Sequence, residues 1–202
     1  MSILSKKKII GLTGSMGAGK SQVSKYVAKR YPVLDCDQVN AHLLEKGQKG
    51  YQALVKKALV PLDEKGNIDK VQMAQQMFQV ADRKQRIEDL LHPLILNEMQ
   101  TWAQAQTASL VFMEVPLLFE SHVESMFDSI WCVVTNQDIA LDRLQKYRHF
   151  TASQAQARLA YQMDPEVKIR KSDVVIYNNA GLDGLYAQVQ KALEREESCV
   201  GL

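Results

Sequence analysis

A glycine-rich segment near the amino terminus carries the clearest chemistry in the sequence. Residues 14–21 read Gly-Ser-Met-Gly-Ala-Gly-Lys-Ser, which satisfies the spacing G-x-x-x-x-G-K-[ST]. Glycines let the backbone curl around an anion with its N–H groups turned inward. In this pattern Lys20 supplies a mobile cation for the β and γ phosphates, and the Ser21 hydroxyl is placed to hold Mg²⁺. The segment therefore predicts binding of a nucleoside triphosphate.

The residues on either side of this loop have the periodicity that the pattern requires. An apolar run at 8–13 predicts a buried strand, and Val23 and Val27 recur at helical spacing from Lys20 onward. The amino terminus of that helix adds a favourable dipole for phosphate. A chance match in a glycine-rich turn is the alternative, but spacing and context agree, which favours nucleotide binding.

Two acids follow at the end of a second predicted strand, residues 32–37. Ligands of open parallel sheets bind at the carboxyl ends of strands, and the alternation of a strand places Asp35 and Asp37 on one side. A carboxylate there can orient or deprotonate an acceptor hydroxyl beside the γ-phosphate. The alternative is a polar strand end or a helix N-cap.

A basic segment later in the chain is a candidate lid. Helices are expected at 137–147 and 152–163, with a capping box opening at Thr151 and Pro165 ending the second helix. Two such helices can close over bound phosphates and exclude water, although a solvated helix pair is the alternative. Between residues 141 and 171 the local net charge is +4, with three acids against seven basic residues: Arg143, Lys146, Arg148, Arg158, Lys168, Arg170 and Lys171.

Three uses of the nucleotide compete: a small-molecule kinase, a regulatory GTPase and a mechanical ATPase. A GTPase needs N/T-K-x-D after a late strand, but residues 135–138 read Thr-Asn-Gln-Asp. A D-x-x-G match at 63–66 falls in a polar, mainly helical region. A motor ATPase usually has a strand ending in Asp, for which Glu114 is the nearest equivalent. These departures favour a small-molecule kinase.

The remaining elements define the fold class. Strands alternate with helices, which predicts an α/β protein whose parallel sheet is covered on both faces. The sequence contains no internal repeat or low-complexity linker, so additional helices are interpreted as insertions into one core. Further strands are expected at 110–115, 129–134 and 173–177, a mainly helical region at 40–107 with a turn at 61–67, and a final helix at 183–196.

Composition excludes several classes of protein. The chain has 202 residues, 46% of them apolar, and a net charge of +2, which calls for neither nucleic acid nor an anionic membrane as a partner. Its three cysteines are widely separated and include no CxxC pair, which favours a reducing compartment. No signal peptide and no membrane span are expected, so a soluble cytoplasmic protein is predicted. The composition leaves the oligomeric state open.

Over nearly its whole length the chain resembles the dephospho-coenzyme A kinase family. Many kinases share the loop alone, whereas the accompanying motifs in this order are specific to the family. The motifs are the loop at 11–21, Asp35-Cys36-Asp37, Leu91-His92-Pro93-Leu94-Ile95, Pro116-Leu117-Leu118-Phe119-Glu120, Gln162, Lys168 and the segment 172–179.

The resemblance implies a three-layer P-loop kinase core with a parallel five-stranded sheet, similar to nucleoside monophosphate kinases. Residues 1–40, 108–138 and 171–202 would form this core, residues 41–107 an inserted helical acceptor domain, and residues 139–170 a helical lid. The implied reaction is ATP-dependent phosphorylation of the 3′-hydroxyl of dephospho-coenzyme A with Mg²⁺. A nucleoside or nucleotide kinase of the same fold is the alternative, and a GTPase switch is a weaker one.

The resemblance also implies roles for individual residues. Asp37 and Lys20 would be catalytic, and Ser21 and Asp37 would hold the metal. ATP would contact Gly17, Ala18, Gly19, Lys20, Ser21, Gln22, Arg143, Arg148, Asn178 and Asn179. The acceptor would contact Asp37, His92, Pro116, Leu117, Leu118 and Glu120.

Two positions depart from the family pattern. The arginine that usually follows the D-x-D element is replaced by His42. A second lid arginine is expected four residues after Arg143, where this chain has Tyr147 followed by Arg148. A neighbouring arginine would then have to serve in its place.

Overall fold

The structure is a computed structural model that describes residues 7–79 and 81–201. The described chain divides into two compact units. Unit 1 contains the residues up to Leu34 and those from Gln106 onward, and unit 2 contains Asp35–Ala105. Within the described residues, none of the helices is long and apolar enough to cross a membrane.

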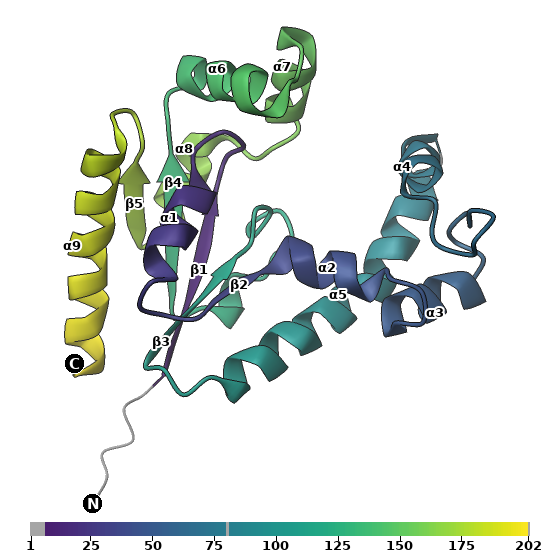
Figure 1. The fold of residues 1–202 in the computed structure, drawn as a ribbon, viewed down its shortest axis with the longest axis horizontal. Coiled ribbons are helices and arrows are strands. Elements are labelled where there is room, and N and C mark those ends of the chain that lie inside the picture. The colour runs from purple at the N-terminus through teal and green to yellow at the C-terminus, as the bar shows by residue number, and fades with distance from the viewer. Residues whose placement is uncertain (1–6, 80, 202) are drawn as a thin grey trace, which may run out of the picture. The chain divides into compact units, whose positions relative to one another are not determined.

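Unit 1 is built on a five-stranded sheet with the order β2-β3-β1-β4-β5 (Figure 1). Strand β1 pairs in parallel with β3 and β4, and β4 pairs in parallel with β5. This arrangement confirms the predicted parallel α/β sheet. The strands are β1 (Lys8–Gly14), β2 (Val33–Asp35), β3 (Leu110–Glu114), β4 (Ser129–Val134) and β5 (Val174–Tyr177).

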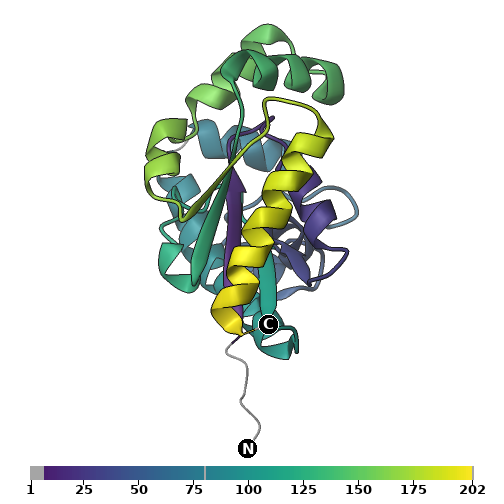
Figure 2. The same ribbon diagram turned by 90° about the vertical axis from the view of Figure 1, so that its left-hand side faces the viewer.

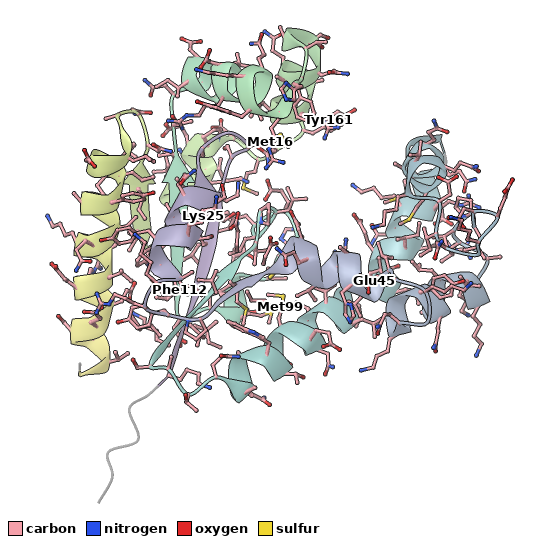
Figure 3. The ribbon with its side chains drawn as sticks, in the orientation of Figure 1. Met16, Lys25, Glu45, Met99, Phe112 and Tyr161 are labelled. Carbon is pink, nitrogen blue, oxygen red and sulfur yellow. The ribbon has the colours of Figure 1, made fainter. Side chains whose placement is uncertain are left out.

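Two helices cover one face of this sheet. Helix α1 (Lys20–Val27) and helix α9 (Leu182–Val200) pack on one buried cluster, and Figure 2 shows α9 running across the strands. The sheet supplies Ile10, Leu12 and Phe112 to this cluster, and Phe112 is labelled in Figure 3. The alternation of β1 turns Gly11 toward the opposite face.

The opposite face is covered by the segment between β3 and β4, which includes the short 3-10 helix η1 (Glu124–Met126), and by α8 (Pro165–Arg170). A Cβ atom on Gly11 would lie 2.7 Å from Leu118 and 2.9 Å from Phe127. Such distances leave no room for a side chain, so Gly11 allows the segment to lie directly on the sheet.

The region predicted as a lid contains three helices. Helix α6 (Gln137–Arg148) packs against α7 (Ala152–Ala160), and Thr151 forms the predicted capping box with Gln154. Helix α7 ends at Ala160, and Pro165 begins α8 behind the capping residue Asp164. The prediction that Pro165 ends the second helix was therefore wrong, because proline fits the first turn of a helix, where its missing N–H has no partner to lose.

Unit 2 is helical, as the sequence predicted. Its helices are α2 (Cys36–Leu43), α3 (Lys49–Lys56), α4 (Lys70–Gln79) and α5 (Ala81–Ala105). The expected turn contains an antiparallel bridge between Leu62 and Ile68. The helices share a buried cluster of Leu44, Leu54, Leu59, Ile68, Met73, Ile87 and Leu91.

The buried carboxylate of Glu196 connects α9 to the amino end of the sheet. Glu196 forms an ion pair with Lys8 and accepts hydrogen bonds from Ser129 Oγ at 2.7 Å and Trp131 Nε1 at 3.1 Å. Burial alone would raise the pKa of Glu196, but the hydrogen bonds from Lys8, Ser129 and Trp131 together lower it below its usual value. The group is therefore a satisfied buried anion.

Candidate active site

The glycine-rich loop connects β1 to α1, as predicted. Gly14, Gly17 and Gly19 have φ angles of 144°, 79° and 98°, a region that side-chain-bearing residues rarely adopt. Gly19 is the N-cap of α1, and the helix begins at Lys20. The loop therefore presents backbone N–H groups at the amino terminus of a helix, which is the geometry of a phosphate site.

The charged and polar side chains of the loop lie at this helix start. Lys20 Nζ donates to the carbonyl oxygens of Gly14 at 2.8 Å and Ser15 at 3.1 Å. Ser21 is exposed in the first turn of α1. Gln22 is half-buried and accepts a hydrogen bond from Tyr186 at 3.4 Å. Lys20 and Ser21 are thus both located where the motif requires them.

Asn178 and Arg143 contact the backbone of this loop. Asn178 Nδ2 donates to the carbonyl oxygen of Ala18 at 2.8 Å. The Arg143 guanidinium donates to the carbonyl of Gly17 at 3.3 Å and to the carbonyl of Asn178 at 3.0 Å. Asn179 acts elsewhere: its Oδ1 accepts the N–H of Asn136 at 2.8 Å at the start of α6. The two adjacent asparagines therefore stabilise two different elements.

The region predicted as a lid contacts Met16, within the loop, through Gln162. The N–H of Met16 donates to Gln162 Oε1 at 2.8 Å, and Figure 3 labels Met16 together with Tyr161, the residue before Gln162. Arg148 is exposed in the last turn of α6. Arg158 lies 4.6 Å from the ring centroid of Phe150.

The basic residues of this region therefore do not form one cluster. Lys168 is 0% exposed and pairs with Glu120 at 2.8 Å, while Lys171 pairs with Glu124 at 3.1 Å. Among the basic side chains described between residues 141 and 171, Arg143 is the one for which a contact with the glycine-rich loop is found.

The segment after β3 places its two leucines in different environments. The Pro116 carbonyl accepts a hydrogen bond from Thr13 at 3.4 Å, at the end of β1. Leu117 is 48% exposed, whereas Leu118 is fully buried beside Gly11. Of the two leucines expected to line the acceptor site, Leu117 is the one whose side chain reaches solvent.

Glu120 joins this segment to α8 and to the residues just before it. Its Oε1 contacts Lys168 and accepts the N–H of Met163 at 3.0 Å. Burial alone would raise the pKa of Glu120, but Lys168 and the Met163 N–H together lower it below its usual value. Its Oε2 is buried and has no hydrogen-bond partner within the described parts of the chain.

Cys132 lies near this pair and is a core residue. Burial raises the pKa of its thiol, an effect that Lys168 and a hydrogen bond with Ser172 only partly oppose. The thiol is therefore protonated at neutral pH and is not an activated nucleophile.

The two predicted acids have different local structures. Strand β2 ends at Asp35, whose carboxylate accepts the N–H groups of Asp37 at 2.9 Å and Gln38 at 3.3 Å. Asp35 is thus the N-cap of α2, the alternative raised by the sequence, and Asp37 is exposed in the first turn of that helix. The prediction that both acids alternate along one strand was wrong. Asp35 caps a helix that begins at Cys36, so the strand ends two residues before Asp37.

His92 was predicted to bind the acceptor, and it is exposed on α5. Pro93 lies inside the same helix. Asp35, Asp37 and His92 all belong to unit 2, whereas the loop, Asn178, Arg143 and Glu120 belong to unit 1. The structure therefore assembles the nucleotide side of the predicted site within unit 1.

The sequence identified Gln162 only through the family resemblance and Lys168 through the resemblance and the basic composition of the candidate lid, and it predicted no contact for either residue. In the sequence, Gln162 is only a glutamine that follows α7, and Lys168 is only a lysine within α8. Neither periodicity nor composition reveals that Lys168 is buried or that Gln162 accepts a backbone N–H.

A parallel sheet whose first strand leads through a glycine-rich loop into a helix defines the core of a P-loop kinase. A family model described as dephospho-CoA kinase matches residues 8–184. The chain belongs to the dephospho-CoA kinase family.

Individual proteins support this assignment. A dephospho-CoA kinase of Thermosynechococcus vestitus is 34% identical over 188 residues, covering 91% of this chain and 92% of that protein. A crystal structure of a Thermus thermophilus protein has a TM-score of 0.83 and 28% identity, covering 95% of this chain and 98% of that one. A dephospho-CoA kinase from Campylobacter jejuni, with a TM-score of 0.68 and 22% identity over 94% of this chain and 96% of that one, supports the fold.

Proposed function

We propose that this protein transfers the γ-phosphoryl group of ATP to the 3′-hydroxyl of dephospho-coenzyme A and so forms coenzyme A. The observation that carries the proposal is the loop of residues 14–21 at the start of α1, inside a chain whose family match extends over residues 8–184. The loop supports the assignment of the nucleotide site, and membership of the family supports the choice of dephospho-coenzyme A as the acceptor.

On the nucleotide side, the chain's own groups bind and orient the phosphates. The loop N–H groups and the amino terminus of α1 favour the negative charge of the phosphates. Lys20 lies at the loop, where its ammonium can move from the Gly14 and Ser15 carbonyls to a phosphate oxygen. Arg148, exposed on α6, is the lid cation available to neutralise charge on the transferring group.

The residues at this site are compatible with a magnesium ion that is coordinated mainly by phosphate oxygens and water. Mg²⁺ prefers oxygen ligands and keeps several waters, so it needs few protein side chains. The Ser21 hydroxyl is an exposed oxygen donor in the first turn of α1, and the described residues hold no group of three or more His, Cys, Asp or Glu side chains arranged for a metal. When bound, the ion would neutralise phosphate charge, with Ser21 and Asp37 as its protein ligands.

On the acceptor side, Asp37 would orient or deprotonate the 3′-hydroxyl. Residues 41–107 would form the acceptor domain and residues 139–170 the lid, with 1–40, 108–138 and 171–202 as the core. His92 and the exposed Leu117 are the accessible side chains expected to contact the coenzyme.

The direct test of this reaction is incubation with Mg-ATP and dephospho-coenzyme A, followed by detection of coenzyme A by mass. Dephospho-coenzyme A should react far better than AMP or adenosine, because a site built for one acceptor rejects analogues that leave its polar groups unpaired. Comparable rates with AMP or adenosine would instead identify a nucleotide or nucleoside kinase.

Paired substitutions test the role of Asp37. Asp37→Asn keeps the size of the side chain but removes a proton acceptor, so kcat should fall by about 10²- to 10⁴-fold. Asp35→Asn is the matched control, because asparagine is as good an N-cap as aspartate and should preserve the start of α2. A profile with Asp35→Asn inactive and Asp37→Asn mild would reverse the assignment.

The protein is also proposed to work in the cytoplasm. Cys36, Cys132 and Cys199 are all free thiols. Free thiols in place of disulfides are typical of reducing compartments.

A further inference from the structure

Asn178 is buried, and both its backbone and its side chain form hydrogen bonds to protein groups. Its side chain is among the buried polar groups at 4% relative exposure. Its backbone N–H donates to Val134 at 2.8 Å, and its carbonyl accepts from Thr135 Oγ1 at 2.8 Å and from Arg143 at 3.0 Å. In its side chain, Nδ2 donates to Ala18 and Oδ1 accepts from Arg143 at 3.3 Å.

The contact with Ala18 fixes the direction of one peptide group in the loop. In a trans peptide the C=O and the following N–H point in opposite directions, and the described chain has no cis peptide. Because the Ala18 carbonyl points toward the Asn178 amide, the N–H of Gly19 must point away from Asn178. That N–H belongs to the N-cap of α1, where the helix dipole favours an anion.

The space around Gly19 agrees with this arrangement. A Cβ atom on Gly19 would lie 2.2 Å from Asn178 Nδ2, so the amide is in direct contact with the loop backbone. Arg143 holds the adjacent Gly17 carbonyl, while the Ala18 N–H closes the loop by donating to Ser15 at 3.2 Å. The consecutive carbonyls of Gly17 and Ala18 are thus held by the side chains of Arg143, in α6, and of Asn178, which directly follows β5.

We infer that Asn178 is a positioning residue that holds the Ala18–Gly19 peptide with its N–H toward the bound phosphates, and that Arg143 supports it from α6. The inference rests on the proposed nucleotide site. It assigns Asn178 to the phosphates through the loop, in place of the adenine contact expected from the sequence.

Two ligands distinguish a role of Asn178 in phosphate binding from a role in adenine binding. Tripolyphosphate carries the phosphates of ATP without its base, so calorimetric Kd values for Mg-ATP and Mg-tripolyphosphate report base and phosphate recognition separately. Asn178→Leu keeps the side-chain shape and removes the donor, leaving the Ala18 carbonyl buried without its partner. Both Kd values should rise by a similar factor of about tenfold.

The matched control is Gln188→Ala. Gln188 exchanges hydrogen bonds with the backbone of Tyr177, the residue before Asn178, at 2.9 Å and 2.8 Å. It braces the end of β5 without contacting the loop, so both Kd values should stay at those of the unmodified protein. A rise for Gln188→Ala equal to that for Asn178→Leu would overturn the inference.

Two other outcomes would also overturn it. Weaker ATP binding with unchanged tripolyphosphate binding would assign Asn178 to adenine, and no change in either Kd would remove it from the site. If Asn178→Leu does not fold, Asn178→Ala and Arg143→Met replace it, and their double variant should show coupled, non-additive losses of tripolyphosphate affinity. Additive losses would contradict a shared action on the loop.

These measurements do not require the acceptor. Failure of the unmodified protein to bind Mg-ATP would refute the proposed function itself. Normal ATP binding by the unmodified protein with no effect of Asn178→Leu would refute only the role of Asn178.

Discussion

Unit 1 contains two buried lysine–glutamate pairs that differ in which partner is buried. At the amino end of the sheet the Glu196 side chain is 4% exposed and that of Lys8 is 20% exposed. In the segment beyond the carboxyl end of β3 the order is reversed, with Lys168 at 0% and Glu120 at 21%. One pair thus buries an anion and the other a cation.

The pairs also differ in how well the buried group is satisfied. Glu196 accepts from Ser129 and Trp131 in addition to Lys8, so its charge is shared among three donors. Lys168 faces one carboxylate, and the second oxygen of that carboxylate has no hydrogen-bond partner in the described chain. The first arrangement links α9 to the sheet through three donors, whereas in the second the buried Lys168 depends on its pairing with Glu120 within the described chain.

The largest stability loss is expected from Glu120→Gln. The substitution leaves a fully buried ammonium without its counter-charge, and breaking a buried pair in this way typically costs about 3–5 kcal/mol. Urea denaturation followed by circular dichroism measures the loss. The double variant Lys168→Met/Glu120→Leu should recover most of the stability, because it buries two apolar side chains in place of the charges.

A smaller loss is expected from Glu196→Gln at the other end of the sheet. Lys8 can reach solvent, but the amide satisfies its donors less well than a carboxylate, so the cost should be about 1–3 kcal/mol. Coenzyme A formation should stay near normal, since these residues lie at the strand ends away from the loop. Glu194→Gln, on the exposed side of α9, is the control and should change stability by less than about 0.5 kcal/mol. A larger loss for Glu196→Gln than for Glu120→Gln would contradict the comparison.

The Glu196 contribution should also depend on pH in a defined direction. Its pKa in the folded protein is below its usual value, so its stabilisation is fully present above the unfolded pKa and is lost as pH falls through the folded value. The stability difference between the unmodified protein and Glu196→Gln should therefore shrink below about pH 4.3, the usual pKa of a glutamate. A difference that stays constant down to acid unfolding would show that the carboxylate charge is unimportant.

The smallest effect is expected from Ser129→Ala. It removes one of three donors to Glu196, and a single hydrogen bond contributes about 1 kcal/mol. Denaturation at neutral pH should show a loss smaller than that of Glu196→Gln. An equal loss would mean that Ser129, and not the ion pair, anchors α9.

The loop and the sheet were predictable because their signals are local. Glycine spacing, a short apolar run and the periodicity of Val23 and Val27 all come from neighbouring residues, and each was confirmed. The predicted capping box at Thr151 was confirmed for the same reason.

Contacts between distant residues could not be read from the sequence. Asn178 and Ala18 are 160 residues apart, and Gln162 and Met16 are 146 apart. Their meeting depends on the order of strands in the sheet. The prediction that Asp37 lies in a strand was wrong for a local reason: the same residue type ends strands and caps helices, and only the backbone distinguishes them.

Trp131, one of the three donors to Glu196, is also an intrinsic fluorescent probe. Trp131 is fully buried in unit 1, and Trp102, the other of the two tryptophans, belongs to unit 2. Indole emission shifts to longer wavelength when water reaches the ring. In Trp102→Phe, fluorescence excited selectively at tryptophan reports unit 1 alone, while circular dichroism at helical wavelengths follows both units. Coincident transitions would show one cooperative folding unit, and separated transitions would show two that melt independently.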